Sequence, residues 1–520
     1  MVDPALGYVQ TVTEPRVHQE IERKLDVPAR FRLPALSGAS EGIGDVVAQP
    51  TLRLTAEYYD TSDLRLARNR ITLRRRTGGG DDGWHLKLPH AAEDTRDEVQ
   101  LPFASAGQPP TLLSNLALGI TRGAELVPVA TLRTDRRPSL VYDGHGVALA
   151  ELTDDRVSVT IGGKVVSRFR ELEVEAAQGR TAHDLDPVVA ALLAAGATES
   201  GFASKAVRAL GPRAIEPPDV PTARSVRPRD AAGEAIQNLL AQHVTAFIAH
   251  DLGVRRDLPD SVHQLRVAAR RLRSALKVFA SLLDAQWAAH LREELAWIAG
   301  ELGAARDNEV LERRLLAGLA TIDDKGTTRA AAIVRRELGR DEHMAASDVA
   351  AAMQSVRYLA LLDALVAASR APMLSAAASA RAGDALPPLM RSTWRRLARS
   401  VRALHQNGPD EAWHAARIRA KQARYAADAL VPVFGRPAKK LAAQLERVTE
   451  LLGSHQDAAV AAQSAATLAA AKGVGGRAGY VLRLLHDAQR AEVRTTRKEF
   501  KRIWPTVAKP RRRRWLRDEF

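Results

Sequence analysis

The spacing of hydrophobic residues changes along the chain, from a short period in the first 210 residues to a long one after residue 229. In the first part, apolar and polar residues alternate over short segments, and turn clusters such as Thr77–Gly83 separate these segments. Alternation with a period of two predicts β-strands, and tight turns between them predict antiparallel pairing. The segments predicted as strands are 17–27, 71–76, 84–89, 95–102, 147–155 and 168–176.

The second part is rich in alanine and leucine at helical spacing, and two of its segments repeat. Residues 262–273 read VHQLRVAARRLR, and residues 413–424 read WHAARIRAKQAR. Each is followed by a similar element, LGAARDNEV at 302–310 and LGSHQDAAV at 452–460. Two landmarks that recur in the same order at one offset predict an internally duplicated all-α domain.

These patterns predict an α+β multidomain protein, because a chain of 520 residues is too long for one compact core. We expect a flexible N-terminus at 1–15, an antiparallel β-domain at 16–210 and a proline-rich extended linker at 211–228. The helical domain should span 229–508, with halves at 229–380 and 381–508, and an exposed basic tail should follow at 509–520.

Charged residues of the predicted strands fall on one face of each strand. Side chains alternate between the two faces, so Glu20, Glu22 and Lys24 point the same way. The other strands repeat this arrangement with Arg74 and Arg76, Lys87, Arg96 and Glu98, Glu151 and Asp155, and Glu171, Glu173 and Glu175. A solvent-exposed face explains any single strand. Six such strands together predict a closed barrel with a polar interior.

A polar interior that mixes cations with carboxylates indicates a particular kind of ligand. Unpaired buried charge is costly, so these side chains need each other or a bound ion. Carboxylates hold hard divalent cations, and arginine and lysine bind phosphate oxygens. The mixture predicts a site for polyphosphate with Mg²⁺ or Mn²⁺, in which water attacks a phosphorus atom in line. The chain lacks a GxxxxGK[ST] loop, which excludes a P-loop enzyme.

The segment EIERK, at Glu20–Lys24, resembles the ExExK signature of the CYTH, or triphosphate tunnel metalloenzyme, family. The segments YYDTSDLRLARNRITLRRR, WHLKLP, RDEVQLP, AELTDD, RELEVE and SK at Ser204–Lys205 are similar to its later motifs, in the same order. The resemblance implies an eight-stranded antiparallel tunnel with flanking helices. It also implies hydrolysis of triphosphates with a bound divalent cation.

The same resemblance implies roles for individual residues. The catalytic signature would be Glu20, Glu22 and Lys24. The metal ligands would be Glu20, Glu22, Glu171 and Glu173. The triphosphate-binding residues would be Lys24, Arg74, Arg76, Lys87, Arg96, Arg133 and Lys205. An acidic wall would consist of Glu98, Glu151 and Asp155, and the choice between Arg136 and Arg137 as a tunnel residue is open.

Each of the two repeated segments forms a basic stripe if it is helical. The first stripe contains His263, Arg266, Arg270, Arg273 and Lys277, and the second contains His414, Arg417, Lys421 and Arg424. A solvated face explains either helix alone. The duplication in phase favours two stripes that line one groove for a linear polyanion, because like charges need an anion or water between them.

The repeated helices and the elements that follow them resemble the CHAD domain, a duplicated helical domain that often follows CYTH and is associated with inorganic polyphosphate. The resemblance implies that the residues of both stripes bind polyphosphate. We expect Asp307 and Asp457, in the two downstream elements, to pair with neighbouring side chains.

Amino-acid composition limits the classes of molecule that we expect this protein to bind. The net charge of +15 is uneven, since residues 1–210 carry 25 basic and 28 acidic residues, and the rest carry 51 and 33. A basic half indicates a polyanionic partner, and an aromatic content of 4% disfavours nucleic acid bound by base stacking. The absence of cysteine excludes disulfides and thiolate metal sites. Without a signal peptide or a long apolar run, we expect a cytoplasmic protein that associates with polyphosphate granules, and no membrane partner.

The sequence therefore predicts metal-dependent hydrolysis of inorganic triphosphate or short polyphosphate, coupled to polyphosphate binding by the helical domain. Three alternatives stay open. These are a non-catalytic polyphosphate-binding protein, a nucleotide triphosphatase or adenylyl cyclase, and a protein associated with nucleic acid.

Overall fold

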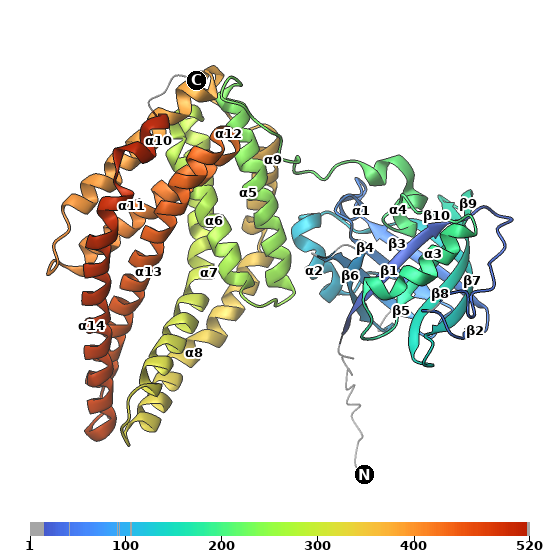
Figure 1. Cartoon of the computed structure of the whole chain (residues 1–520), viewed down its shortest axis with the longest axis horizontal. Helices are drawn as coiled ribbons and strands as arrows, with labels where there is room; N and C mark the ends of the chain where they lie inside the picture. The colour runs from blue at the N-terminus through green and yellow to red at the C-terminus, as the bar shows by residue number, and fades with distance from the viewer. Residues whose placement is uncertain (1–14, 41, 91, 93, 104–106, 517–520) are drawn as a thin grey trace, which may run out of the picture. The chain divides into compact units, whose positions relative to one another are not determined.

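The computed structural model describes residues 15–516 except 41, 91, 93 and 104–106. Within this part the side chains at 304–307, 309 and 339–346 are not described, and the predicted flexible N-terminus lies almost entirely outside it. The chain divides into two compact units, Met1–Pro218 and Asp219–Phe520 (Figure 1). One unit is rich in strands and the other is helical, which confirms the predicted fold class.

The first unit is a closed antiparallel β-barrel. Its eight strands are β1 (Arg16–Asp26), β3 (Leu52–Asp60), β4 (Thr72–Thr77), β5 (Gly83–Pro89), β6 (Thr95–Leu101), β7 (Val127–Tyr142), β8 (Ala148–Ile161) and β9 (Lys164–Ala176). They are ordered β1-β6-β5-β4-β3-β7-β8-β9, and β9 pairs with β1 to close the barrel, with Lys24 opposite Glu173. Two short strands extend the sheet, β2 (Val46–Ala48) on β7 and β10 (Thr198–Glu199) on β1.

The outer face of the barrel is the apolar one. Leu152, Leu172 and Val174 point outward and pack with Val188 and Leu192 of helix α3 (Asp186–Ala194). The charged residues at alternate positions therefore turn inward, as the strand pattern predicts. The remaining helices of this unit are α1 (Arg65–Arg68), α2 (Thr111–Thr121) and α4 (Lys205–Leu210).

Local chemistry fixes the connections between strands. The buried carboxylate of Asp60 accepts backbone N–H groups of Thr61, Leu66 and Ala67 at 2.7, 2.8 and 2.9 Å, so it holds the start of α1 after β3. Gly78, after β4, has φ +94°, and a Cβ there would lie 2.0 Å from the carbonyl oxygen of Arg53. Only glycine fits this turn.

The helical unit consists of two halves with the same order of long helices. The first half contains α5 (Ala232–Arg255), α6 (Ser261–Val278), α7 (Ala285–Ala320) and α8 (Thr327–Gln354). The second contains α10 (Ala382–Arg402), α11 (Asp410–Ala429), α13 (Arg436–Ala470) and α14 (Gly476–Val507). The helices α9 (Val356–Arg370) and α12 (Val431–Phe434) complete the unit. Ala231 and Arg381, which precede α5 and α10, pair with each other, so the two halves meet at equivalent positions.

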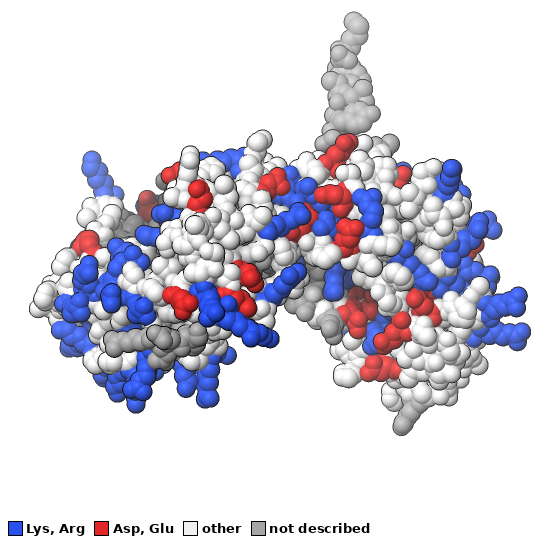
Figure 2. Space-filling view, turned by 90° about the horizontal axis from the view of Figure 1, so that it is seen from above, with Lys and Arg blue, Asp and Glu red and all other residues white. Residues whose placement is uncertain are grey.

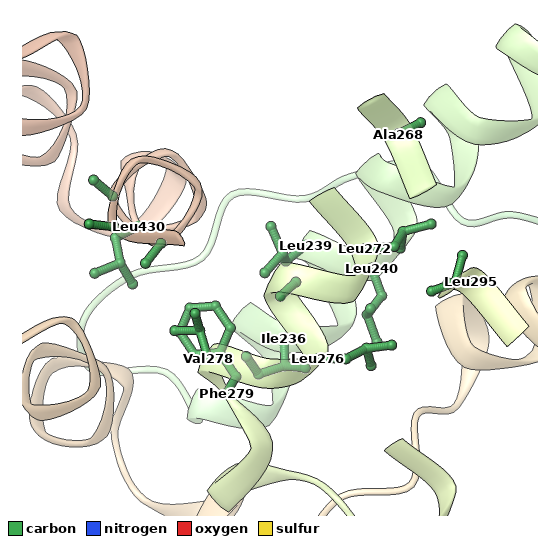
Figure 3. Packing of buried hydrophobic residues seen from close by; sticks show 14 of the residues in the cluster. Ile236, Leu239, Leu240, Ala268, Leu272, Leu276, Val278, Phe279, Leu295 and Leu430 are labelled. Carbon is green, nitrogen blue, oxygen red and sulfur yellow. The ribbon is translucent and has the colours of Figure 1, made fainter. Parts of the chain in front are cut away.

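One hydrophobic core joins the two halves. Figure 3 shows Ile236 and Leu240 of α5 packed with Leu272 and Leu276 of α6. Leu430, from the second half, belongs to the same cluster. The apolar stripes of α6 and α11 are buried in this core, which leaves their basic stripes on the opposite side.

The linker is shorter than its composition predicts. Residues Gly211–Ile215 form a 3₁₀-helix whose Ala214 is buried in the first unit. At the other end, Val226 is buried in the helical core, and the backbone N–H of Arg224 donates to Asn238 Oδ1 at 2.5 Å. Both ends of the segment 211–228 therefore belong to folded units.

Arg511 and Arg514 are exposed, but the prediction of an exposed C-terminal tail is wrong for Trp515 and Leu516, and residues 510–516 are folded. They form the 3₁₀-helix η5 (Pro510–Leu516), in which Trp515 and Leu516 are buried. The ring of Trp515 lies 5.2 Å from that of Phe434, centroid to centroid. The physical reason is that one large aromatic side chain buries enough apolar area to hold a short basic segment in place.

Among the described helices, no single one is long and apolar enough to cross a membrane. One bent pair, Ser347–Gln354 with Val356–Arg370, passes that test of length and composition only when its two helices are taken together.

Candidate functional site

The interior of the barrel contains a cavity of about 320 Å³. The predicted residues that line it are Glu20, Glu22, Lys24, Arg74, Arg76, Lys87, Arg96, Glu98, Glu151, Glu173 and Lys205. They come from strands β1, β4, β5, β6, β8 and β9 and from the start of α4. The structure therefore brings most of the predicted tunnel residues into one cavity.

The two signature glutamates of β1 are buried and paired with lysines. Lys87 Nζ donates to Glu20, and Lys24 Nζ donates to Glu22. Burial raises the pKa of Glu22, but the charges of Lys24 and Lys87 outweigh it and lower the pKa to about 2. Glu22 is therefore a carboxylate at neutral pH, which is the form that binds a cation.

Guanidinium groups crowd the opposite wall. Burial lowers the pKa of Arg76 to about 9, with the charges of Arg74 and Arg136 acting in the same direction. The Nε atoms of Arg74 and Arg76 are buried and have no hydrogen-bond partner among the described residues. Donors of this kind, beside like charges, are suited to a bound anion.

A second charged cluster surrounds Lys205 at the start of α4. Ser204 Oγ accepts from the backbone N–H of Val207 at 3.2 Å and so caps the helix, which places Lys205 in its first turn. Lys205 Nζ lies 2.7 Å from Glu171 and 2.6 Å from Glu173. This cap gives a physical role to the Ser-Lys motif.

Asp155 belongs to the same cluster. Its carboxylate lies 3.0 Å from Lys205 Nζ and accepts from Arg136 at 2.9 and 2.7 Å. Glu171 and Asp155 are buried, and neither is among the residues that line the cavity. In this arrangement Glu171 is a partner of Lys205 and Arg208, at 2.7 and 3.6 Å, and not a cavity-facing metal ligand.

The prediction that Arg133 lines the tunnel is wrong. Arg133 is exposed, and it is not among the residues that line the cavity. Arg136 lies three residues further along β7, and an odd step reverses the face of a strand. Arg136 lines the cavity and Arg137 is exposed, which answers the question that the sequence leaves open.

His18 and Glu175 are among the lining residues that the resemblance did not assign to the site. His18 Nε2 lies 3.1 Å from Glu98 and 3.5 Å from Glu20, and hydrogen bonds to Glu20 and then Glu98 raise its pKa to about 10. Burial, together with the charge of Glu20, raises the pKa of Glu175 to about 7. The period of two already places Glu175 on the charged face of its strand, and the same period, continued from Glu20 to His18, could have found His18.

The carboxylates of the cavity fit a hard divalent cation. Glu20, Glu22, Glu173 and Glu175 all line the cavity, and burial, followed by the charge of Glu20, raises the pKa of Glu175. His18, Glu20 and Glu98 also offer three ligand atoms within 4.8 Å of one another. Oxygen-rich ligand sets of this kind suit Mg²⁺ or Mn²⁺.

In the helical unit the two basic stripes converge. Helices α6 and α11 contact each other, and Arg271 lies over the ring of Tyr425 at 6.0 Å. Burial, and then the charges of Arg417, Arg270 and Arg266, lower the pKa of Lys421 to about 8. Cations of both stripes are therefore close enough to repel one another.

Not all residues of the stripes face the same space. Arg424 donates to Glu446, and His414 Nδ1 lies 2.8 Å from Gln456 Oε1. Arg266 is buried and packs against Gly303 of α7, where an added Cβ would lie 3.2 Å from a guanidinium nitrogen. Arg273 and Lys277 are exposed at the C-terminal end of α6.

The two aspartates of the downstream elements differ in what the structure describes. The negative charge of Asp457 favours a higher pKa of Lys421. The side chain of Asp307 lies outside the described residues.

Figure 2 shows more basic than acidic side chains on the face of the helical unit that it draws. Acidic and basic residues are mixed on the first unit.

The groups around Lys421 predict a pH-dependent affinity for polyanions. The charges of Arg417 on its own helix and of Arg270 and Arg266 on α6 lower the pKa of Lys421, and the charge of Asp457 on α13 raises it. We expect a bound polyanion to raise the pKa of Lys421 above its value of about 8 in the free protein. The affinity for the polyanion is then highest below pH 8 and falls as the pH rises above 8. Between pH 7.5 and 9.5, where histidines are neutral, we expect the affinity for polyphosphate to fall by up to about tenfold.

Titration of the affinity by fluorescence anisotropy measures this effect. Lys421→Arg is the matched control, since arginine keeps its charge throughout this range, and its affinity should stay constant. An equal fall in wild type and in Lys421→Arg would show that Lys421 does not contact the anion.

The fold and the site together define a class, a triphosphate tunnel domain joined to a duplicated helical domain. The CYTH domain family matches residues 18–208, and the CHAD domain family matches residues 238–466. Two proteins of Mycobacterium tuberculosis, MT2285 and Rv2226, are each 33% identical to this chain over 501 residues, which cover 91% of this chain and 93% of theirs.

Two solved structures are similar to parts of the chain. PptA from Streptomyces chartreusis is 29% identical with a TM-score of 0.47, covering 53% of this chain and 100% of its own. The CHAD domain from the plant Ricinus communis is 25% identical with a TM-score of 0.41, covering 53% of this chain and 96% of its own.

This chain belongs to the CYTH and CHAD families, with CYTH first and CHAD second. The CYTH family is metal-dependent and acts on triphosphates, and both domains are associated with triphosphate or polyphosphate binding.

Proposed function

We propose that the barrel hydrolyses inorganic triphosphate or short polyphosphate with Mg²⁺ or Mn²⁺, and that the helical unit binds inorganic polyphosphate. The observation that supports this most strongly is the composition of the barrel cavity. Carboxylates of β1 and β9 face guanidinium groups of β4 and β7 across the same 320 Å³. A site for a metal–phosphate complex requires both kinds of group.

In this proposal, some side chains of the cavity bind the metal and others bind the phosphate oxygens. When bound by Glu20, Glu22 and Glu173, the cation would neutralise charge on the phosphate oxygens. Arg74 and Arg76 would hold the oxygens at the opposite wall, and their unpartnered Nε atoms would find acceptors there. Lys24 and Lys87 would leave their glutamate partners and donate to phosphate, so that a hydrogen bond to the substrate replaces each internal ion pair.

The lining of the cavity supports a substrate without a nucleobase. Tyr58 is the one phenylalanine, tyrosine or tryptophan among the described lining residues. It is 5% exposed and packs with Leu132 and Val157 in the barrel wall, so it offers little surface for a base to stack on. This composition favours inorganic phosphates over the alternatives of a nucleotide triphosphatase or a cyclase.

A cut between Pro218 and Asp219 should separate the two activities. The fragment 1–218 retains the cavity and the buried Ala214, and it should hydrolyse tripolyphosphate when metal is present. The fragment 219–520 retains Val226 and both stripes, and it should bind long-chain polyphosphate without metal and hydrolyse nothing. Phosphate release and binding, measured on each fragment with and without EDTA, test this division.

Two results would contradict it. Hydrolysis by the helical fragment would place the catalytic site elsewhere, and polyphosphate binding by the first fragment alone would remove the role of the stripes.

The +18 charge of the chain after residue 210 and the absence of cysteine also fit a cytoplasmic location near polyphosphate granules, which we include in the proposal.

A further inference from the structure

The C-terminal segment η5, which follows the residues matched by the CHAD family, forms a basic pocket with helix α10. This pocket has a volume of about 340 Å³ and lies between α10 and η5. It is lined by Arg391 and Arg395 of α10, by Trp394, and by Arg511, Arg513 and Arg514 of η5, together with Pro510 and Leu516. No carboxylate lines it among the residues that the structure describes.

Specific contacts hold this pocket together. Arg391 donates to the backbone carbonyl of Leu516, and Arg513 donates to that of Ala508 at 3.1 Å. The buried side chain of Trp515 anchors the same segment against Phe434. Five arginines without a lining carboxylate repel one another, so apolar burial and backbone contacts maintain an arrangement that charge alone opposes.

The chemistry of the pocket selects phosphate groups and not bases. Trp394 stacks on Trp504 with centroids 5.6 Å apart, and Arg513 lies over its ring at 3.9 Å. With 7% of its surface exposed, Trp394 cannot stack on a nucleobase. Guanidinium groups recognise phosphate oxygens in pairs of hydrogen bonds, and the exposed Arg511 and Arg514 present such donors.

Basic residues also connect this region with the stripe on α6. Helix α10 contacts both α6 and η5. Burial, and then the charges of Arg419, Arg292 and Arg396, lower the pKa of Lys277, so the end of the α6 stripe lies within reach of cations on α10. A polyanion that follows α6 therefore meets further positive charge in the direction of α10.

We propose that the pocket between α10 and η5 is a second phosphate-binding site of the helical unit, which holds part of a linear polyphosphate chain. This inference rests on the proposed binding of polyphosphate by the stripes. It adds a site that belongs to neither basic stripe, formed by α10 together with η5, which follows the last long helix of the second half.

The test compares Arg511→Ala/Arg514→Ala in the full chain with a charge-matched control, Arg329→Ala/Arg335→Ala on α8. All four arginines are exposed, so each double variant removes two surface charges. The pocket variant should bind long-chain polyphosphate about tenfold more weakly, with a salt slope smaller by about 2. The control should change the affinity by less than about twofold, since distant exposed charges are screened by salt.

Further arms separate the possible outcomes. Arg511→Lys/Arg514→Lys keeps the charge and should keep the salt slope, and tripolyphosphate hydrolysis by the barrel should be unchanged in all of these variants. Equal binding by the pocket variant and the control would overturn the second site. A loss of binding confined to single-stranded DNA would overturn it too, because the ligand would then be a nucleic acid.

The same measurements distinguish failure of the second site from failure of the proposed function. In one outcome, Arg270→Ala/Arg417→Ala/Lys421→Ala loses affinity for polyphosphate while the pocket variant keeps the affinity of wild type. That result would exclude the pocket as a binding site and leave the proposed function of the stripes intact. If wild type does not bind polyphosphate, the proposed function of the helical unit itself fails.

Discussion

Glu20→Gln and Glu22→Gln should each lower phosphate release from tripolyphosphate by about a hundredfold or more, as loss of a group that acts on the reacting atoms commonly does. Both side chains are buried and face the cavity, and the low pKa of Glu22 keeps it in the charged form that binds a cation. Glutamine keeps the shape and removes the charge, so the barrel should remain folded. Lys87 and Lys24 would each lose an ion-pair partner, and thermal unfolding of each variant measures that separate effect.

Asp135→Asn is the matched control for these two variants. Asp135 lies on β7 of the same barrel and is exposed, so its charge does not reach the cavity. Its phosphate release should equal that of wild type. Near-normal hydrolysis by both glutamine variants would exclude the barrel as the catalytic site.

Arg270→Ala/Arg417→Ala/Lys421→Ala should weaken the binding of long-chain polyphosphate by about a hundredfold and reduce the salt slope by about 3, because each cation displaces about one counterion. The charges of Arg270 and Arg417 lower the pKa of Lys421, and the helices α6 and α11 that carry them contact each other. The buried Nε of Arg417 has no hydrogen-bond partner among the described residues. Arg266 is left in place because it packs against Gly303, and its removal would disturb the contact with α7.

A variant with equal loss of charge provides the comparison. Arg329→Ala/Arg335→Ala/Lys498→Ala removes three exposed cations from α8 and α14, and its affinity should stay within about threefold of wild type. If the two triple variants bind alike, general positive charge and not a groove between the stripes attracts the polymer.

The alternation of the strands predicted which face of the barrel carries charge, but not all of its strands. The six segments predicted from the pattern correspond to β1, β4, β5, β6, β8 and β9. Strands β3 and β7 were missed, and β7 contains Pro128 and Pro138, which interrupt the signal of a strand. Without the bounds of β7, the inward face could not be counted, and the error at Arg133 follows from this.

The ion-pair partners of charged side chains could not be predicted from the sequence either. Glu171 and Glu173 are two residues apart and share a face, yet Glu173 lines the cavity while Glu171 is buried beside Lys205 and Arg208. In the helical unit the offset of the repeats predicted both stripes, but Arg424 pairs with Glu446 of α13. Contacts between distant elements decide such cases, and a period along one element carries no information about them.

Phosphate release from tripolyphosphate, long-chain polyphosphate, ATP and thiamine triphosphate, measured side by side with Mg²⁺, with Mn²⁺ and with EDTA, tests the central claim most directly. We expect tripolyphosphate to be hydrolysed fastest, with either metal, and no release from any substrate in EDTA. Faster release from ATP or thiamine triphosphate would contradict a cavity selective for inorganic phosphate, and no metal-dependent release from any of the four would contradict the assignment of the barrel as a triphosphatase.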